Sequence, residues 1–253
     1  MQNKKLYFVT DAHLGAGTDT LDRERELCTL MDKMKEDAAM VVFLGDMFDF
    51  WFTYCYVVPK GFVRFLGKMA ELSDAGIALH FFIGNHDMWL FDYLSSQMKI
   101  TMHSDPDILE FDGKKFLVGH GDGLGHLDKR YDIIRWTFRN KLNQWLFTHV
   151  PSGITFGIAN GWSHRSRKGH IKKNPNIFEY QGDDKEGIVI YCKQRLEHQH
   201  FDFCVFGHRH TPLTRTLSQG CQYVNVGDWL VNRSYAVYDE GKISLLNHYT
   251  TTD

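Results

Sequence analysis

Five short apolar segments of the chain, each rich in residues that favour β-strands, run directly into a loop that carries Asp, Asn or His. Glycine stands just ahead of the polar group in four of them. The loops lie at residues 11–13, 45–49, 84–87, 119–122 and 207–210. Ligands of open α/β sheets bind beyond the carboxyl ends of the strands. We therefore expect the five loops to converge on one site.

The segments between these loops predict an α/β protein. Apolar residues recur at helical spacing in two charged stretches, one at 21–36 and one that begins near Pro59 and ends before Gly76. Strands are expected at 5–10, 40–44, 77–83, 115–118 and 202–206, followed by short antiparallel strands at 214–217, 222–226, 236–238 and 243–246. Early βα alternation and a late β-rich region favour two packed sheets with helices outside.

Residues 126–173 differ from the rest of the chain in charge. They carry ten Lys and Arg against two Asp, a net charge of +8, so the remainder carries −10 of the overall −2. Aromatic and aliphatic residues alternate with the bases. We expect a helical insertion, basic on one side and apolar on the other, between core segments 1–125 and 174–253. The alternative is a solvated pair of basic helices packed on the sheets.

Several classes of protein are not expected. Apolar runs are far shorter than the roughly 20 residues of a membrane-spanning helix, and the first apolar stretch is too short for a secretory signal, so a cytoplasmic location is predicted. The five cysteines are scattered without a Cys-x-x-Cys pair, which argues against a disulfide framework or a thiolate zinc site. The overall charge of −2 and the apolar residues among the bases argue against a nucleic-acid partner.

The side chains of the five loops indicate a chemistry. They offer carboxylate, amide and imidazole ligands without thiolates, which suits Mn²⁺, Fe²⁺ or Zn²⁺. Two such ions about 3.5 to 4 Å apart stabilise the attacking and leaving oxygens of an in-line displacement at phosphorus. The loops therefore predict hydrolysis of a phosphoester.

The motifs Asp-x-His, Gly-Asp-x-x-Asp, Gly-Asn-His-Asp, Gly-His-Gly-Asp and Gly-His-x-His, in this order from residue 6 to about 228, resemble those of the calcineurin-like metallophosphoesterases. The resemblance implies a four-layer α/β/β/α sandwich, with the insertion as a lid, and two divalent metal ions. Mn²⁺ is the expected metal, with Fe or Zn as alternatives. The implied ligands are Asp11, His13, Asp46 and His210 for one ion, and Asp46, Asn85, His120 and His208 for the other.

The same resemblance implies two catalytic residues beside the ligands. His86 is expected to touch the scissile phosphate or the leaving oxygen, and Asp87 to orient it. The best-known members of the branch described next carry Arg at the position of His86 and Glu at that of Asp49.

Three further features resemble one branch of the family: the motif at 45–51, the long insertion, and Val-Gly-Asp-Trp at 226–229. That branch cleaves the diphosphate of UDP-2,3-diacylglucosamine in lipid A biosynthesis, yielding UMP and 2,3-diacylglucosamine 1-phosphate. The implied partners are this lipid-linked nucleotide sugar and, by peripheral contact, the anionic surface of the inner membrane. The implied substrate-binding residues are Asp122, Asp128, Tyr131, Arg167 and Lys168.

Two other functions stay open from the residues. The chain could be a phosphodiesterase or phosphatase for a soluble phosphoester, with the insertion as a specificity loop. It could also be a non-catalytic scaffold on the same fold, although a scaffold has no reason to carry so many metal-compatible side chains.

Overall fold

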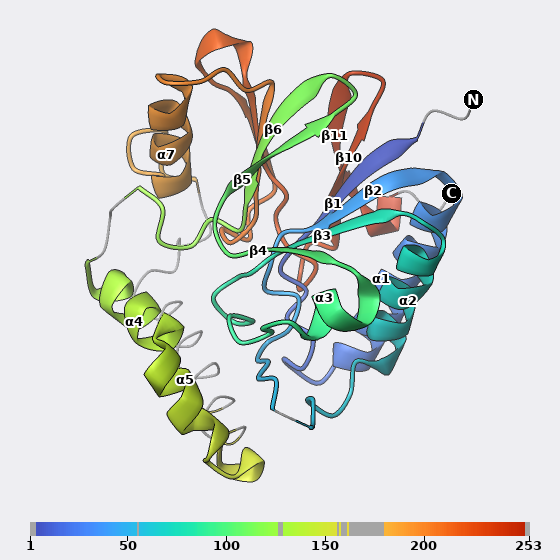
Figure 1. Cartoon of the computed structure of the whole chain (residues 1–253). Coiled ribbons are helices and arrows are strands. Elements are labelled where there is room, and N and C mark those ends of the chain that lie inside the picture. The colour runs from blue at the N-terminus through green and yellow to red at the C-terminus, as the bar shows by residue number, and fades with distance from the viewer. Residues whose placement is uncertain are drawn as a thin grey trace.

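The computed structural model describes residues 4–54, 56–125, 129–155, 157, 161 and 180–250, without the side chains of 129–132, 134 and 250. In this part of the chain the strands form two sheets (Figure 1). Within the same ranges, no helix is both long enough and apolar enough to cross a lipid bilayer.

The first sheet has six strands in the order β11-β10-β1-β2-β3-β4. Its four neighbouring strands β1 to β4 run parallel, and β10 and β11 are antiparallel. The bounds are β1 Lys5–Val9, β2 Ala38–Phe43, β3 Ala78–Phe82, β4 Thr101–His103, β10 Ser234–Asp239 and β11 Lys242–Asn247. All the strands expected in this sheet are present, and β4 was not anticipated.

The second sheet has five strands in the order β5-β6-β7-β9-β8. The bounds are β5 Asp107–Phe111, β6 Lys114–Gly119, β7 Phe203–Phe206, β8 Leu213–Thr216 and β9 Gln222–Asn225. The expected antiparallel pairing of the late strands is present between β8 and β9. On its other side β9 pairs parallel with β7, because β8 forms the sheet edge and β9 returns in the direction of β7.

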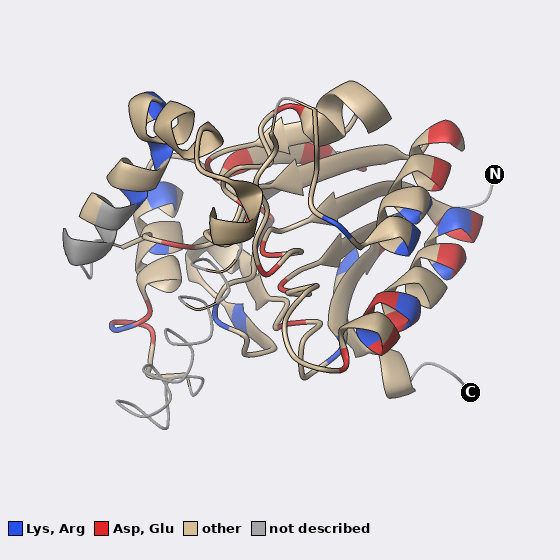
Figure 2. Cartoon of the chain, turned by 90° about the horizontal axis from the view of Figure 1, so that it is seen from below, with Lys and Arg blue, Asp and Glu red and all other residues tan. Residues whose placement is uncertain are grey.

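Helices cover the outer faces of both sheets. On the first sheet lie α1 (Thr20–Asp37), α2 (Val63–Asp74) and α3 (Tyr93–Met98), and on the second lies α7 (Gly187–Leu196). One apolar cluster fills the space between the sheets and two others lie beneath the helices. The expected four-layer α/β/β/α sandwich is confirmed. Figure 2 shows basic and acidic residues interleaved along α1 and α2, the solvated faces of one outer layer.

The start of α2 differs from the expectation. Pro59 lies in the preceding loop, and the helix begins only after Phe62, whose φ is 58°. The Glu24 carboxylate on α1 accepts the backbone N–H groups of Arg64 and Phe65 at 3.0 and 3.1 Å. A carboxylate supplied by a neighbouring helix thus satisfies the first-turn amides, a contact that no local sequence pattern reveals.

The described part of the expected insertion contains α4 (Lys129–Arg139), α5 (Lys141–Thr148) and a further helical stretch at 152–155. The Asn140 side chain caps α5 by accepting the N–H groups of Leu142 and Asn143. Large apolar side chains of this segment face solvent, namely Ile133, Trp136, Leu142, Trp145, Leu146 and Ile154. Two 3₁₀ turns, Ser218–Gly220 and His248–Thr250, complete the described elements.

Candidate metal and phosphate site

The polar loops after β1, β2, β3, β6 and β7 meet where the carboxyl ends of the two sheets approach each other. Backbone hydrogen bonds join them: Asp11 donates to the Gly45 carbonyl at 3.0 Å, and Gly207 donates to the His120 carbonyl at 3.0 Å. The carboxyl-edge convergence expected from the sequence is therefore present.

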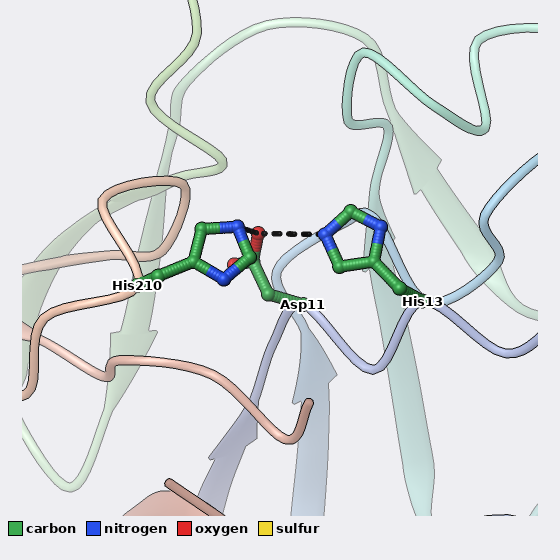
Figure 3. A group of neighbouring side chains, drawn as sticks. All are labelled: Asp11, His13 and His210. Carbon is green, nitrogen blue, oxygen red and sulfur yellow. Dashed lines mark ion pairs between the residues drawn. The ribbon is translucent and has the colours of Figure 1, made fainter. Parts of the chain in front are cut away.

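Asp11, His13 and His210 form one group of possible ligands. Asp11 Oδ1 lies 3.2 Å from His210 Nε2 and 3.7 Å from His13 Nε2, and the two imidazoles are nearly parallel, 5.2 Å apart. Figure 3 shows both rings beside the carboxylate. The other carboxylate oxygen, Asp11 Oδ2, accepts the backbone N–H of His208 and the hydroxyl of Thr10.

Asp46, His120 and His208 form a second group. Asp46 Oδ2 lies 3.4 Å from His120 Nε2, which is also 3.2 Å from His208 Nδ1 and 3.4 Å from Asn85 Oδ1. The opposite nitrogen, His120 Nδ1, donates to the Leu44 carbonyl at 2.8 Å, so Nε2 is left to bind a cation. Asp46 Oδ2 is 3.9 Å from His13 Nε2 as well, and the carboxylate therefore lies between the two groups.

The backbone at these loops is strained. Asp11, His13, Asp46, His208 and His210 all adopt positive φ, between 41° and 65°. Such conformations cost of order 1 to 3 kcal/mol each for residues other than glycine and gather at functional sites. Two glycines make the close approach possible: a Cβ at position 84 would lie 2.2 Å from Asp46 Oδ1, and one at 207 would lie 2.0 Å from Thr10 Oγ1.

The electrostatics of the site favour bound positive charge. Burial alone would raise the pKa of Asp46, yet the histidines around it, His120 first, hold that pKa well below its ordinary value. Burial alone would lower the pKa of His13, but the carboxylates of Asp11 and Asp49 raise it to about 9. His208 behaves differently, since burial and the neighbouring His120 lower its pKa to about 4.

The residues present fit divalent cations. Asp11 Oδ1 and both ring nitrogens of His13 are buried and make no hydrogen bond within the described part of the chain. Burying polar atoms without partners is unfavourable, and metal coordination satisfies them. The donors are carboxylate oxygens and imidazole nitrogens, the ligands suited to Mn²⁺, Fe²⁺ and Zn²⁺.

His86 forms a third group of possible ligands with His13 and Asp46, and it contacts the loop that follows β2. Its Nδ1 lies 2.8 Å from the Asp49 carbonyl and 3.7 Å from the Asp49 carboxylate. The carboxylate of Asp87, the residue expected to orient His86, accepts the backbone N–H groups of Gly84 and Met47. Burial and the Asp46 charge raise the pKa of Asp87 to about 7. Asp49 contacts the His86 ring, and Asp87 ties the two loops together.

The expected substrate-binding residues differ in where they lie and in whether the structure describes them. Asp122 is buried and lines a pocket with His120, Asp105 and Arg135; the Arg135 guanidinium lies 3.9 Å from its carboxylate. Tyr131 belongs to α4, but its side chain is outside the described part. Three further residues lie outside the described residues altogether, namely Asp128, Arg167 and Lys168.

Two buried carboxylates of the site were absent from the expected set. Asp49 lies 3.6 Å from His13 Nδ1 and also holds His86, and Asp228 lies 3.8 Å from His210 Nδ1. Both stand in motifs that the sequence displays, Gly-Asp-x-x-Asp and Val-Gly-Asp-Trp. The available signal was that histidines bound to metals usually contact a carboxylate through their second nitrogen.

Comparisons with known proteins agree with this geometry. A model of the family described as calcineurin-like phosphoesterase matches residues 4–212. The chain is 40% identical over 246 residues to UDP-2,3-diacylglucosamine hydrolase of Porphyromonas gingivalis, which covers 93% of this chain and 94% of that protein. It is 25% identical to the protein of the same name from Shewanella sp. strain MR-4, over 95% and 96% of the two chains.

Among solved structures, the phosphoesterase Yfce from E. coli aligns with a TM-score of 0.50 at 13% identity. The alignment covers 98% of this chain and 95% of that one. At this level of identity the likeness concerns the fold.

Proposed function

The chain belongs to the calcineurin-like phosphoesterase family, and we propose that it hydrolyses the diphosphate of UDP-2,3-diacylglucosamine to UMP and 2,3-diacylglucosamine 1-phosphate. It is a metal-dependent phosphoester hydrolase. The observation that most supports this substrate is the 40% identity to a UDP-2,3-diacylglucosamine hydrolase over 93% of the chain. A scaffold without activity would not need several strained, buried ligands.

The proposed metal ligands follow the two groups of side chains. Asp11, His13, Asp46 and His210 would hold one ion, and Asp46, Asn85, His120 and His208 the other. Bound there, two divalent ions supply Lewis acidity to the attacking and leaving oxygens of the displacement at phosphorus. Mn²⁺ is the proposed metal, because the donors are oxygen and nitrogen without thiolate.

His86 has the position of a group that assists the displacement. A carbonyl oxygen can only accept, so the contact with the Asp49 carbonyl places a proton on Nδ1 of His86. Nε2 is then the atom available to a phosphoryl or leaving oxygen. The Asp46 carboxylate contributes to orientation, because its Oδ1 accepts the His86 backbone N–H at 2.8 Å.

The insertion at 126–173 would act as a lid that binds the acyl chains. Its exposed apolar side chains, Trp136 and Trp145 among them, would otherwise be an unfavourable surface in water. The net charge of +8 suits the diphosphate and an anionic membrane surface. We propose peripheral binding at the cytoplasmic face of the inner membrane, without a nucleic-acid partner.

The decisive experiment is product analysis in isotopically labelled water. The purified protein with Mn²⁺ is incubated with UDP-2,3-diacylglucosamine in H₂¹⁸O, and the masses of both products are measured by mass spectrometry. Attack at the α-phosphorus places ¹⁸O in UMP and none in the lipid phosphate. Turnover of bis-p-nitrophenyl phosphate with no cleavage of the lipid would instead support a soluble phosphoester as the substrate.

A further inference from the structure

Trp89 lies in the loop that follows β3, three residues beyond His86. Its indole is buried and meets two aromatic rings of the loop that follows β2. The ring centroids of Phe52 and Phe50 lie 5.2 and 6.2 Å from it, both edge to face. Trp89 therefore connects the two loops that carry Asn85, His86, Asp46 and Asp49.

The other side of the same indole faces α4 and α5. Trp89 Nε1 donates to the backbone carbonyl of Phe138 at 2.8 Å. The Phe138 and Phe147 rings lie 5.1 and 4.5 Å from it, and Phe147 also lies 4.8 Å from Phe52. The insertion thus packs through an aromatic cluster on both loops of the site.

The hydrogen bond to Phe138 falls at the junction of the two helices. Phe138 is the residue before the end of α4, and α5 begins after the Asn140 cap. The same carbonyl accepts a second hydrogen bond from Gln144 of α5, at 3.1 Å. The direction in which α5 leaves the junction therefore depends on a carbonyl that Trp89 holds.

Apart from a hydrogen bond between the hydroxyls of Tyr54 and the buried Thr155, the other described polar contacts of this segment with the sandwich are made by two arginines of α4. Arg135 and Arg139 pair with the carboxylate of Asp105 at 2.8 and 3.0 Å, but that carboxylate is more than half exposed. Exposed ion pairs contribute little and are screened by salt. A buried indole with a directed hydrogen bond is the more specific contact.

We propose that Trp89 is a positioning residue that holds the α4–α5 junction against the His86 loop and so sets where the acyl-bearing part of the substrate lies relative to the phosphate site. The identity of the substrate in this inference rests on the proposed function, whereas the contact of Trp89 with the α4–α5 junction does not. The Trp89 side chain thereby connects the segment that would bind the lipid to the loop that carries His86.

The test compares Trp89→Phe with Trp51→Phe. Trp51 is also a buried indole, and its Nε1 donates at 2.9 Å to Thr53 in its own loop. Both variants lose one indole hydrogen bond and keep an aromatic ring, but only the bond of Trp89 reaches the insertion. Amide hydrogen exchange over 141–148 is measured together with kcat and KM on the diacylated substrate and on bis-p-nitrophenyl phosphate.

For Trp89→Phe we expect exchange over 141–148 to be about three- to tenfold faster and KM for the diacylated substrate to rise about as much. Its kcat and its turnover of the small phosphodiester should stay within twofold. Trp51→Phe should match the wild type in both the exchange over 141–148 and KM.

Unchanged exchange and KM in Trp89→Phe would overturn the proposal. An equal loss on both substrates would also overturn it, because Trp89 would then support only the His86 loop. If the wild type leaves the diacylated substrate intact, the proposed function fails, and the exchange over 141–148 still decides whether Trp89 holds the junction.

Discussion

His86 lies close enough to His13 and Asp46 to bind a metal ion with them, so the metal content of a His86 variant tests its proposed catalytic role. If His86 assists the displacement through Nε2 and binds no ion, its loss should affect the rate alone. His86→Ala should keep its metal content and lose about 10²- to 10⁴-fold in kcat, the usual contribution of a proton-transfer group. Metal analysis by mass spectrometry and steady-state kinetics measure the two quantities.

Asp46→Ala is the matched comparison for that variant. Its carboxylate lies between both groups of ligands, so its removal should lower the metal content as well as the rate. If His86→Ala also lost an ion, His86 would have to be counted among the ligands.

His80 predicts an acid-sensitive contribution to stability. The Nδ1 atom of His80 lies 2.9 Å from Nε2 of His103. The other ring nitrogen of His103, Nδ1, lies 3.0 Å from the Asp107 carboxylate. Burial and the nearby His103 lower the pKa of His80 to about 4, and Asp107 opposes that shift. As the pH falls below about 6.5, the pKa of His80 in the unfolded chain, the unfolded chain binds a proton at His80 that the folded chain does not bind. The free energy of unfolding therefore falls.

The measurement is the free energy of unfolding in urea at pH 7 and pH 5. From His80 alone we expect a loss of about 1 to 2 kcal/mol over this interval, reduced by the partial exposure of the ring. His80→Gln should lack that part of the pH dependence. Identical pH dependence in the two proteins would mean that the pKa of His80 is not lowered.

At the scale of elements, the start of α2 depends on α1. Glu24 is buried, and its carboxylate accepts two first-turn N–H groups of α2. Glu24→Ala leaves these amides without their acceptor and should destabilise the fold by about 1 to 2 kcal/mol. Chemical unfolding measures the change. Glu36→Ala, at an exposed position of the same helix, should alter stability by less than about 0.5 kcal/mol.

The same elements show what a sequence can and cannot predict. The apolar runs before Asp11 and Asp46 predict their strands well because burial on both faces demands continuous hydrophobicity. The parallel pairing of β9 with β7 and the start of α2 depend on partners outside the local segment, β7 and Glu24, and no local pattern encodes them.

For the molecule as a whole, ordered motifs predict which loops meet, because the topology of the sheets brings carboxyl ends together. They do not predict which carboxylate holds which imidazole. The His86 ring contacts Asp49, whereas the Asp87 carboxylate accepts backbone N–H groups, and the packing of the loop after β2 against that after β3 sets these partners. Side-chain partners of this kind depend on distances of a few tenths of an ångström, which only the assembled fold sets.

The exposed apolar side chains of α4 and α5 predict how the whole molecule distinguishes lipid from soluble substrates. Each buried methylene contributes about 0.8 kcal/mol, so shorter acyl chains should raise KM steeply. Trp145 is 58% exposed, and Trp145→Glu should weaken binding to anionic vesicles and raise KM for the diacylated substrate. Turnover of bis-p-nitrophenyl phosphate and the melting temperature should stay unchanged, because the described contacts of Trp145 are with Thr148 and His149 of its own segment. An equal loss on both substrates at an unchanged melting temperature would show that this surface does not select for lipid.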